Sequence, residues 1–423
     1  MLGTVLFSAS LSSCSSNDNE PAGTPDAPGG GGIPVAEETG LTEELEATYN
    51  QDINDFAFNA LRSMAARNQG TSLIFSPVSA ASVLAILNDG ATGQTRQELL
   101  KVLGFGDATT KALNEYFQKL MVTAPESDTT TTLRMANAVY ANKSCTFLQP
   151  FVDDLTKYYQ AEAATLDFAS PKAKEYINSW CNRQTEGLIP QFVDGLSPET
   201  QSMLLNAVYF KGKWVTPFDM PTQKRTFYCE DGTETEQDLM YLSEKNSQKN
   251  IYYETDSYQA VRMAYGQGKY AMTFLLPKKG VATTADIIDC LSAQWWKDLA
   301  GNLKRTTDSF YIIVPRFSVT TSDEAANLVP LLQSMGVSSL FSPTAEVPNI
   351  LEGINLSLTE IRQKAVINVT EDSTEAAAVT GADTVGAGEE PQRIIYFYAD
   401  HPFVYVISDV NTGVIYFAGT YQG

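Results

Sequence analysis

The sequence predicts a single α+β domain with large mixed β-sheets, preceded by an export signal and a flexible tether. Strand-like segments recur at wide separations along the chain, and helical stretches lie between several of them. With 423 residues, of which 43% are hydrophobic and 19% are charged, the chain is long enough to bury a large core. No internal repeat occurs, so we expect one domain whose strands run mostly antiparallel.

The first fourteen residues are typical of an export signal. Residues 2–11 form an apolar run that is too short to span a bilayer permanently. The run ends in Leu-Ser-Ser-Cys, which resembles the bacterial lipobox, where the cysteine is lipidated and becomes the mature N-terminus. We therefore assign residues 1–14 to a lipoprotein signal peptide with lipidation at Cys14. No basic residue precedes the apolar run, which leaves the true start of the protein open.

Residues 15–44 are predicted to be a flexible tether. Their composition shifts to Ser, Asn, Asp, Glu, Pro and Gly, with four consecutive glycines at 29–32. The folded domain is expected to cover residues 45–423. A lipid and a tether would hold this domain off a membrane, so we expect an exported lipoprotein of a bacterial cell envelope, surface-exposed or extracellular.

Charge and histidine content exclude several functions. The net charge of −21 and the pI near 4.4 disfavour nucleic acid as a partner, because its phosphates would be repelled. The single histidine, His401, leaves no Ser/His/Asp triad except through itself and no multi-histidine zinc site. It precedes Pro402 and Phe403, which favours a structural role at a packed strand entry. We expect no metal and no cofactor.

Cysteine spacing gives no sign of redox or metal chemistry. The five cysteines are Cys14, Cys145, Cys181, Cys229 and Cys290. No two of the last four are close in sequence, so the chain contains no CxxC motif. The favoured interpretation is that these four are buried free thiols.

Two helices are predicted at the start of the domain. From about Asp52, apolar residues recur at helical spacing up to Arg67. Ser76 before Pro77 predicts the next helix start, because Ser can cap free amides and Pro at the first helical position loses no hydrogen bond. Gly90 can end that helix.

Further helices and strands alternate along the rest of the chain. Thr95 with Glu98 offers a capping box for a third helix. Residues 150–159 and 323–335 are also helical in pattern, with Pro330 as a kink in the second. Strands are predicted over residues 133–140, 203–210, 258–265, 270–276, 310–317, 361–371, 394–398, 403–409 and 414–420.

The run from Glu371 to Gly388 lies between two strand-like segments and has an unusual composition. It contains no Pro, Lys, Arg, aromatic or large aliphatic residue, so it cannot bury a core of its own and should be exposed. From Thr374 onward the even positions are uncharged, whereas both acids, Glu375 and Asp383, occupy odd positions. As a strand, this segment would have one uncharged face of small residues suited to a packed core.

Five segments of the chain carry a resemblance to a known family. In residues 363–378 a strand runs into an acidic pair, a small residue, Thr-Glu and a run of alanines. This pattern closely resembles the hinge of inhibitory serpins. Residues 72–95 resemble the N-terminal serpin signature, and residues 206–218 resemble a central strand that ends at a buried Trp. Residues 400–403 and 412–419 resemble the C-terminal strand pair, and because all matches follow family order the chain is identified as a serpin.

The resemblance implies a fold and a mechanism. A serpin domain has about nine helices and an exposed reactive-centre loop. It implies a serine-type endopeptidase inhibitor that acts as a suicide substrate: the protease cleaves the loop, stays attached as an acyl-enzyme, and is trapped when the loop inserts into the main sheet. The implied partner is a serine protease in a covalent 1:1 complex, with a cysteine protease as a second candidate. The inhibitor itself is expected to be a monomer.

The resemblance also assigns site residues. The hinge residues are Glu371, Ser373, Thr374, Glu375, Ala376, Ala377 and Ala378. The residues implied in sheet opening are Ser76, Ser79, Trp214, Arg316 and Gln363. Glu371 resembles the loop-base acid of the family, and Arg316 corresponds to its basic partner.

Three positions depart from the family pattern. Ser72 stands where Asn is usual, Ser373 where Gly is common, and Gln363 where the family has a sheet-gating His. Serine instead of glycine makes the hinge less pliant. The glutamine argues against a histidine-dependent pH response of sheet opening, although its amide can still hydrogen-bond there.

The bait bond is found by counting from Glu371. In inhibitory serpins it usually follows the seventeenth residue from this acid, and 371 + 16 gives Ala387–Gly388. The alternative is Val385–Gly386. Both bonds present a small aliphatic residue to the protease.

The composition around the bait bond predicts the target. Residues 372–392 contain no Lys, Arg, Phe, Tyr, Leu or Met, so trypsin-like and chymotrypsin-like proteases would lack an anchor. An elastase-like or subtilisin-like protease is the better candidate. Asp383 keeps an aspartate-specific protease open, and residues 389–390 keep a glutamate-specific one open. The simpler interpretation is that these acids keep the loop soluble.

Two other function classes are weaker candidates. A non-inhibitory serpin serving as a binding or carrier protein would share every fold motif and would fail only to trap proteases. An enzyme is disfavoured, because the sequence has only one histidine, no phosphate-binding loop and no clustered metal ligands. A hinge free of Pro, with Thr374 and three alanines to face the core, favours the inhibitor.

Overall fold

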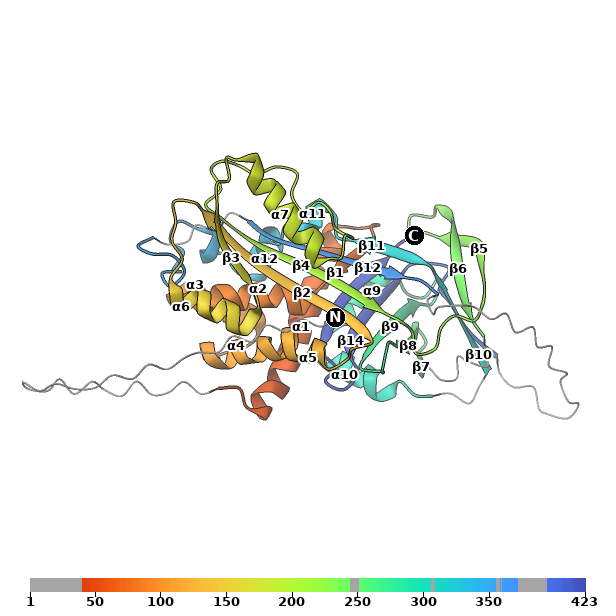
Figure 1. The fold of residues 1–423 in the computed structure, drawn as a ribbon. Coiled ribbons are helices and arrows are strands. Elements are labelled where there is room, and N and C mark those ends of the chain that lie inside the picture. Colours follow the sequence, from red (N-terminus) through yellow and green to blue (C-terminus); the bar gives the residue numbers. More distant parts are fainter. Residues whose placement is uncertain (1–39, 244–250, 306–308, 355–357, 359, 372–393) are drawn as a thin grey trace, which may run out of the picture. The chain divides into compact units, whose positions relative to one another are not determined.

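The computed structural model describes residues 40–243, 251–305, 309–354, 358, 360–371 and 394–423 (Figure 1). The described residues belong to one folded unit. Cys14, the hinge residues 373–378 and both candidate bait bonds lie outside the described residues. Within the described ranges, no helix is both long and apolar enough to cross a membrane.

The sheet that positions the candidate site has five strands in the order β11-β12-β4-β2-β3. They are β2 (Thr131–Asn142), β3 (Glu162–Leu166), β4 (Ser202–Gly212), β11 (Phe317–Thr320) and β12 (Glu360–Val369). β2 pairs antiparallel with β4, and β11 pairs antiparallel with β12. The central pair, β4 and β12, is parallel, with Gln363 opposite Asn206.

Both faces of β4 are buried, and its side chains alternate between two clusters. Met203, Leu205, Ala207 and Tyr209 pack with the cluster that includes Trp180 of α7 (Pro171–Gln184). Leu204, Val208 and Phe210 belong to the main core on the opposite face. Figure 1 shows α7 lying across the five-stranded sheet.

Two further sheets complete the domain. The six-stranded sheet is antiparallel throughout, in the order β1 (Leu73–Phe75), β15 (Ile415–Tyr421), β14 (Phe403–Asp409), β9 (Tyr270–Pro277), β8 (Tyr258–Ala264) and β7 (Ile251–Glu254). The four-stranded sheet has the order β13 (Ile394–Tyr398), β10 (Ser309–Pro315), β6 (Glu234–Leu242) and β5 (Met220–Tyr228). Its edge strand β13 runs parallel to β10.

The described helices surround and enter the core. The longer ones besides α7 are α1 (Glu43–Arg67), α2 (Pro77–Gly90), α3 (Gly93–Leu103), α4 (Thr110–Gln118) and α10 (Ala293–Asn302). Shorter ones are η1 (Lys119–Thr123), α5 (Ala124–Glu126), α6 (Gln149–Asp154), η2 (Leu155–Tyr159), α9 (Thr284–Cys290), α11 (Asp323–Ala326), α12 (Val329–Met335) and η3 (Ser339–Phe341).

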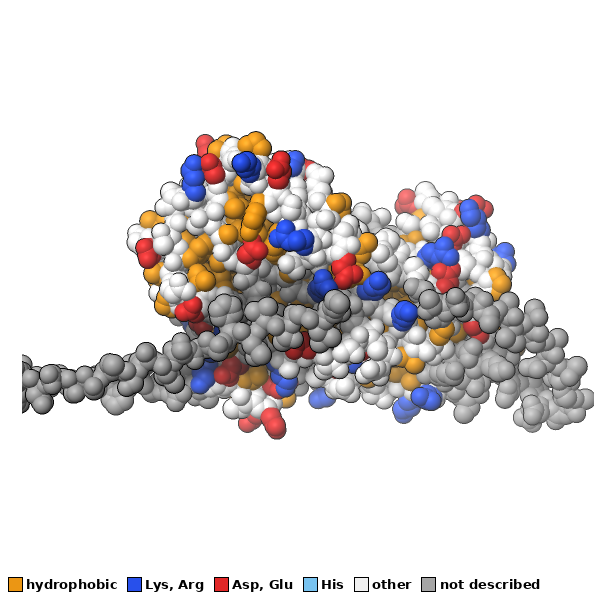
Figure 2. Space-filling view, in the orientation of Figure 1, with side chains coloured by type: hydrophobic (Ala, Val, Ile, Leu, Met, Phe, Trp, Pro, Cys, Tyr) orange, Lys and Arg blue, Asp and Glu red, His pale blue; other side chains and the backbone are white. Residues whose placement is uncertain are grey.

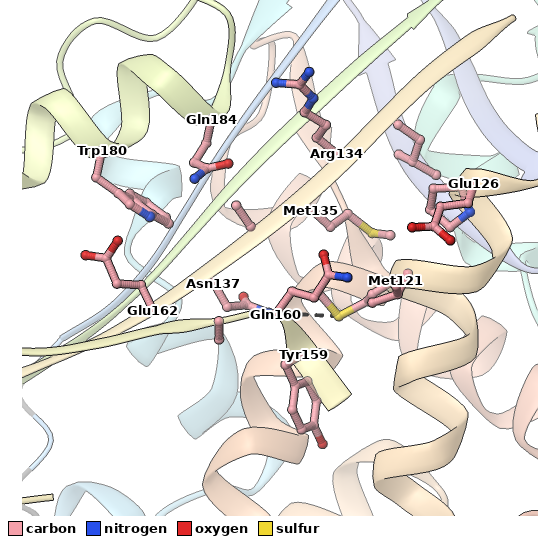
Figure 3. Close-up of a pocket in the computed structure, with 15 residues that line it drawn as sticks. Met121, Glu126, Arg134, Met135, Asn137, Tyr159, Gln160, Glu162, Trp180 and Gln184 are labelled. Atoms are coloured by element: carbon pink, nitrogen blue, oxygen red, sulfur yellow. Dashed lines mark hydrogen bonds between the residues drawn. The ribbon is translucent and has the colours of Figure 1, made fainter. Parts of the chain in front are cut away.

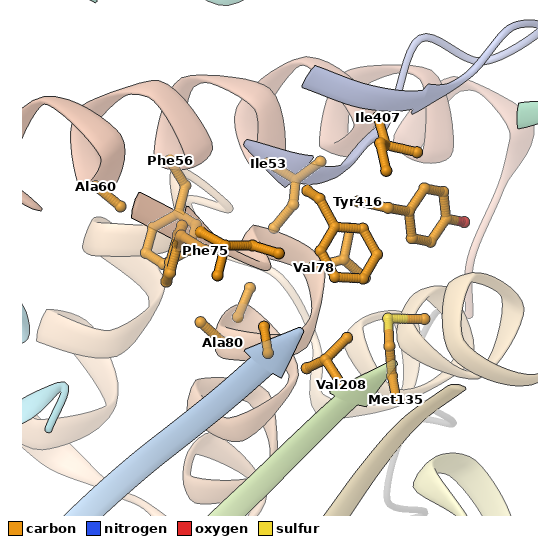
Figure 4. Packing of buried hydrophobic residues seen from close by; sticks show 14 of the residues in the cluster. Ile53, Phe56, Ala60, Phe75, Val78, Ala80, Met135, Val208, Ile407 and Tyr416 are labelled. Carbon is orange, nitrogen blue, oxygen red and sulfur yellow. The ribbon is translucent and has the colours of Figure 1, made fainter. Parts of the chain in front are cut away.

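Helix α2 lies in the middle of the core. All of its residues except Asp89 are buried, and a helix that is apolar on every side must be covered on every side. Figure 4 shows Val78 and Ala80 of α2 close to Phe56 of α1 and Val208 of β4. Helix α2 therefore supports the core-facing side of the central parallel pair.

Helix α1 begins earlier than predicted. The apolar periodicity placed its start near Asp52 and the domain boundary at residue 45, but the helix begins at Glu43. Thr42 is its N-cap, and the Thr42 hydroxyl accepts a hydrogen bond from the Leu45 amide at 3.2 Å. The first turn is acidic and mostly solvent-facing, so apolar periodicity could not reveal it.

The capping box predicted for the third helix is wrong. Helix α3 begins at Gly93, so Thr95 and Glu98 lie inside it. The carboxylate of Glu346 accepts a hydrogen bond from the Gln94 amide at 2.6 Å and so caps the first turn. This partner is distant in sequence and could not be found by reading local motifs.

Two predicted elements are divided in the structure. The strand predicted over residues 310–317 is two strands, β10 and β11, which belong to different sheets and meet at Arg316. The helix predicted over residues 323–335 is interrupted between Ala326 and Val329. Pro330 therefore lies in the first turn of α12, where its missing N–H loses no bond, and not at a kink.

The described cysteines are free, but the prediction that all four are buried is wrong. Only Cys181 is buried, and burial raises the pKa of its thiol to about 12. Cys290 is exposed because it ends α9 at the surface, and Cys145 and Cys229 are partly exposed.

Candidate functional site

The end of β12 is fixed by a charged cluster at Glu371. Arg316 Nε donates to Glu371 Oε2 at 3.0 Å, and a second guanidinium nitrogen and the Thr222 hydroxyl donate to Oε1. Partial burial alone would raise the pKa of Glu371, but these hydrogen bonds hold it below its usual value. The expected Arg316–Glu371 pair is therefore present. It ties the last described residue before the loop to the point where the chain passes from β10 of the four-stranded sheet to β11 of the five-stranded sheet.

Trp214 links the ends of β4 and β12. Its indole N–H donates to the Thr370 carbonyl at 2.9 Å. The ring stacks on Tyr265 with centroids 4.0 Å apart, and Phe218 packs edge-on at 6.2 Å. Because Trp214 follows β4 and Thr370 follows β12, this bond spans the central pair at the end from which the loop leaves.

Gln363 lies at the middle of the same pair and is fully hydrogen-bonded. Its Oε1 accepts from the Ser76 amide at 3.0 Å, and its Nε2 donates to the Ser76 carbonyl and to Asn206 Oδ1, each at 2.9 Å. The Ser76 hydroxyl makes no cap bond and no other hydrogen bond, which contradicts its predicted capping role. It is the Ser76 backbone that holds the strand.

A buried polar chain continues from Gln363 across the sheet. Asn206 Nδ2 donates to the Ser79 hydroxyl and to Asn137 Oδ1, the second at 2.6 Å. Asn137 Nδ2 donates to the Ser82 hydroxyl at 3.0 Å. Of these residues, Gln363 and Ser79 were predicted from the sequence, whereas Asn137, Asn206 and Ser82 were not. The available signal was a single asparagine within the apolar stretch of each strand, residues 135–141 of β2 and residues 203–210 of β4.

The opposite face of β12 carries a second attachment. Lys364 is 8% exposed, and its ammonium contacts Asp323 Oδ1 at 2.6 Å and the Gln191 carbonyl at 3.1 Å. The same ammonium lies 5.9 Å from the centre of the Phe192 ring. Consecutive residues of β12 therefore bind α2 on one side and the α7–β4 connection on the other.

A cavity of about 440 Å³ lies beside β2, next to the polar chain (Figure 3). Figure 3 shows Trp180 and Glu162 on one side of it and Met121 and Tyr159 on another. Asn137 reaches it from β2, with its Nδ2 3.9 Å from the Met121 sulfur. No group of three or more His, Cys, Asp or Glu in the described part of the chain could hold a metal ion.

His401 occupies the entry to β14, where the sequence placed it. Its Nδ1 lies 2.9 Å from Asp400 Oδ1 and its Nε2 lies 2.7 Å from the Pro277 carbonyl oxygen. Since both ring nitrogens have these partners, neither is available to activate a serine.

Comparison with known proteins decides the family. A family model described as "Serpin (serine protease inhibitor)" matches residues 51–422. The chain is a serpin. Iripin-2 of Ixodes ricinus is 30% identical over 387 residues, which cover 88% of this chain and 93% of that protein. Alpha-1-antiproteinase of Rattus norvegicus is 28% identical over 394 residues, which cover 91% and 92% of the two chains.

Solved structures agree with this assignment. The structure of human thyroxine-binding globulin in complex with thyroxine has a TM-score of 0.78 and 26% identity, covering 90% of this chain and 99% of that one. The native state of the thermophilic serpin Tengpin has a TM-score of 0.78 and shares the fold. The predicted single α+β serpin domain is therefore confirmed.

Serpin membership also gives the general activity. Serpins are protease inhibitors and not enzymes, and they form complexes with target serine proteases. In this serpin, all five residues assigned to sheet opening lie along or beside β4 and β12. They are Ser76, Ser79, Trp214, Arg316 and Gln363. Their roles in opening, and those of the hinge residues 373–378, stay predictions.

Proposed function

We propose that this serpin inhibits a serine endopeptidase as a suicide substrate, by entry of its cleaved loop between β4 and β12. The observation that carries the proposal is that these two central strands are parallel. The loop follows β12 at Glu371, so a segment that folds back into the sheet runs antiparallel to both neighbours. A single new strand could then form a ladder on each of its sides.

The energetics favour an irreversible step. The entering strand would replace one ladder, between β4 and β12, with two. A strand of about 12 residues would thereby gain on the order of ten backbone hydrogen bonds, each worth roughly 1 kcal/mol net. This gain is comparable to the stability of a whole domain.

The same step would trap the protease. At about 3.3 Å per residue, insertion carries the cleaved end roughly 40 Å along the sheet. A protease still attached to that end as an acyl-enzyme would be dragged along and distorted before hydrolysis. The product is a covalent 1:1 complex with a serine protease. A cysteine protease, which also forms an acyl-enzyme, is the second candidate target.

The bait bond is proposed to be Ala387–Gly388, with Val385–Gly386 as the alternative. Small aliphatic residues on the acyl side of each bond suit an elastase-like or subtilisin-like pocket. Lipidation at Cys14 would place the inhibitor on a bacterial cell envelope, with residues 15–44 supplying most of its reach.

The first test is incubation of the domain, without residues 1–40, with an elastase. We expect a complex that survives denaturing electrophoresis and a released peptide that begins at Gly388. A peptide that begins at Gly386 would keep the mechanism and move the bond. If every elastase-like and subtilisin-like protease tested cleaved the loop and none formed a complex, the proposal would be contradicted.

A matched pair of hinge variants tests insertion itself. Thr374 is at an even position, which is predicted to face the core after insertion, and Glu375 is at an odd one. Thr374→Arg should convert the inhibitor into a substrate, because a buried unpaired charge blocks insertion. Glu375→Arg should form the complex as the parent does. Equal behaviour of the two variants would count against the inserted strand.

A non-inhibitory carrier is the alternative. Human thyroxine-binding globulin, solved with thyroxine bound, has the same fold, so fold alone does not separate the two functions. Thermal unfolding of the cleaved protein does. An inhibitor should unfold at a much higher temperature after loop cleavage, because a new strand completes the sheet, whereas a carrier that does not insert its loop should not.

A further inference from the structure

A second cavity, of about 640 Å³, lies between the end of α1, helix α9, the turn between β5 and β6, and the end of β15. Its volume is within the usual range of small-molecule sites, about 300–1,000 Å³. None of the residues that line it belongs to β4 or β12, so it is separate from the site described above. Its floor consists of five buried side chains, those of Leu73, Thr284, Ile288, Thr420 and Gln422.

The floor contains a buried hydrogen-bond acceptor without a partner. Gln422 is 8% exposed, and its Oε1 makes no hydrogen bond within the described part of the chain. Its Nε2 donates to the Thr284 hydroxyl at a long 3.5 Å. An unpaired buried carbonyl keeps its desolvation cost, and the last side-chain torsion of glutamine is soft. Oε1 can therefore turn to meet a donor that enters the cavity.

The backbone of Gln422 is held in place beside the cavity. Its amide donates to the Ser72 hydroxyl at 2.9 Å, and the neighbouring residues Leu73 and Thr420 lie opposite each other in the β1–β15 ladder. Ser72 is one of the three positions that depart from the family pattern. A residue that is particular to this chain therefore helps to place Gln422.

The rim of the cavity is acidic. Three exposed carboxylates, those of Glu230, Asp231 and Asp289, face one guanidinium, that of Arg62. Arg62 is already engaged, because one of its terminal nitrogens donates to three main-chain carbonyls at the end of α9 at 2.9–3.3 Å. Hydrogen bonds from Thr233 hold the pKa of Asp231 below its usual value, so this carboxylate stays ionised. The rim therefore attracts a cation.

We propose that this cavity binds a small organic amine, which covers the floor with an apolar body, places its ammonium group at the rim and donates a second N–H or O–H to Gln422 Oε1. Leu73, Ile288, Ala65 and Ala285 supply the apolar surface for the body. An anion is disfavoured by the rim carboxylates, and a purely apolar ligand would leave Oε1 unpaired. The proposal does not depend on the inhibitory mechanism, because the cavity has no part in the paired strands β4 and β12.

The first test is NMR of the full-length chain, labelled at isoleucine methyl groups, with tryptamine as the probe. Tryptamine has an ammonium group and an indole N–H, and we expect a dissociation constant of about 1 mM or lower. The Ile288 methyl signal should shift, whereas that of Ile177, which is buried in the separate cluster beneath α7, should not. If Ile288 did not respond, or if both signals shifted equally, the proposal would be wrong and the cavity would hold only water.

Three analogues of tryptamine separate the features of the ligand. Tryptophol carries a hydroxyl in place of the ammonium and should bind about tenfold more weakly, because the rim no longer attracts it. Indole-3-acetate is negatively charged and should bind more weakly still. 1-Methyltryptamine, methylated at the indole nitrogen, should bind about fivefold more weakly, because Oε1 stays unpaired. Equal affinities for tryptamine and indole-3-acetate would overturn the assignment of a cationic ligand.

Two variants assign these features to residues. Glu230→Gln combined with Asp289→Asn should bind tryptamine and tryptophol with equal affinity, while Glu199→Gln, at an exposed carboxylate outside the cavity, should keep the tenfold difference. Gln422→Leu should bind tryptamine and 1-methyltryptamine equally. A variant that kept the parent's preference at either position would refute the role proposed for that residue. Since the comparison of probes needs no substitution, a variant that does not fold leaves the test intact.

A last probe distinguishes a small ligand from a protein side chain. Nα-acetyl-lysine methylamide carries the same charge on a flexible chain but has no second donor beside an apolar ring. It should shift the Ile288 signal less than tryptamine does at equal concentration. If the lysine derivative shifted the signal and tryptamine did not, the cavity would be a socket for a partner's lysine, and the proposal of a small amine would be overturned.

Discussion

Two pairs of central strands are held together in different ways. Between β4 and β12 the strands are parallel, and buried polar side chains of Gln363 and Asn206 cross from one to the other. Between β14 and β9 the strands are antiparallel, and most of the side chains on both are buried and apolar. Phe274 of β9 packs against Phe403 of β14 with ring centroids 5.8 Å apart.

The difference shows which pair the chain can separate. A hydrogen bond between side chains can be exchanged for another with a new strand's backbone or with water. Close-packed apolar contacts have no such substitute, and opening them exposes the core. The β4–β12 pair lies at the centre of its sheet and is joined by side-chain hydrogen bonds that a new strand or water can replace. The β14–β9 pair is joined by apolar packing that nothing can replace, so it forms the fixed part of the domain.

The largest effect should come from the apolar pair. Phe274 is fully buried, so Phe274→Ala should lower the free energy of unfolding by about 3–5 kcal/mol through lost burial and a residual cavity. Urea unfolding followed by tryptophan fluorescence measures this change. Val281→Ala, at a side chain that is 64% exposed, is the control and should change stability by less than about 0.5 kcal/mol. A loss below about 1.5 kcal/mol for Phe274→Ala would mean that this pair is not the fixed one.

A smaller effect is expected at the polar pair. Gln363→Leu removes three hydrogen bonds and leaves the Ser76 amide and Asn206 without this partner. We expect a loss of about 2–3 kcal/mol, because unpaired buried groups retain their desolvation cost. In addition, the uncut Gln363→Leu variant should lose its inhibitory activity faster than the uncut Phe274→Ala variant, when the two are compared at equal free energy of unfolding. Equal rates would erase the distinction between the pairs.

The isosteric change Gln363→Glu sharpens that comparison through its pH dependence. One carboxyl oxygen could still accept from the Ser76 amide, but the other would face the Ser76 carbonyl and Asn206 Oδ1. Burial should raise the folded-state pKa of this new carboxyl, since only the protonated form can donate to those oxygens. The folded state would then bind the proton more tightly, and stability should rise as the pH falls through that pKa. A stability that is independent of pH between 4 and 8 would contradict the described geometry.

The fold class and the elements that have local start and stop signals could be predicted from the sequence. Contacts between segments that are distant in sequence could not. The helix 77–90 was predictable because Ser-Pro starts it and Gly90 ends it, and these are local signals. The break at Arg316 was not, because residues 310–317 read as one continuous strand while the chain passes between two sheets. Arg316 itself was found through family resemblance.

The polar chain across the sheet was predicted only in part for the same physical reason. Gln363 and Ser79 stood out in family motifs, but Asn137 and Asn206 acquire their role from each other across the β2–β4 ladder. A strand pattern shows which residues are buried, and it does not show which buried residue lies opposite. The Lys364–Asp323 contact on the other face of β12 was not predicted for the same reason, because its two residues are distant in sequence.

A modest effect is expected at Glu371. Because its pKa lies below the usual value in the folded state, its pairing stabilises the fold at neutral pH, and this contribution is lost as the pH falls through the folded-state pKa. The Arg316 side chain is 45% exposed, so the contribution is screened to about 1 kcal/mol or less. Glu371→Gln should remove the part of the acid sensitivity that appears as the pH falls below the ordinary glutamate pKa of 4.5, without changing stability at the low-pH end. An acid sensitivity equal to the parent's would place the titrating group elsewhere.

The smallest effect should come from the α7 side of β12. Lys364→Met removes a cation whose ammonium binds Asp323 and the Gln191 carbonyl, yet the Asp323 side chain is 63% exposed and returns to water when the lysine is lost. Methionine can fill the space beside the Phe192 ring, so a change within about 1 kcal/mol is expected. The result matters for the comparison because residues 363 and 364 hold the same strand from opposite faces. If Lys364→Met costs as much as Gln363→Leu, the α7 connection is an equal restraint on β12, and sheet opening must release both faces together.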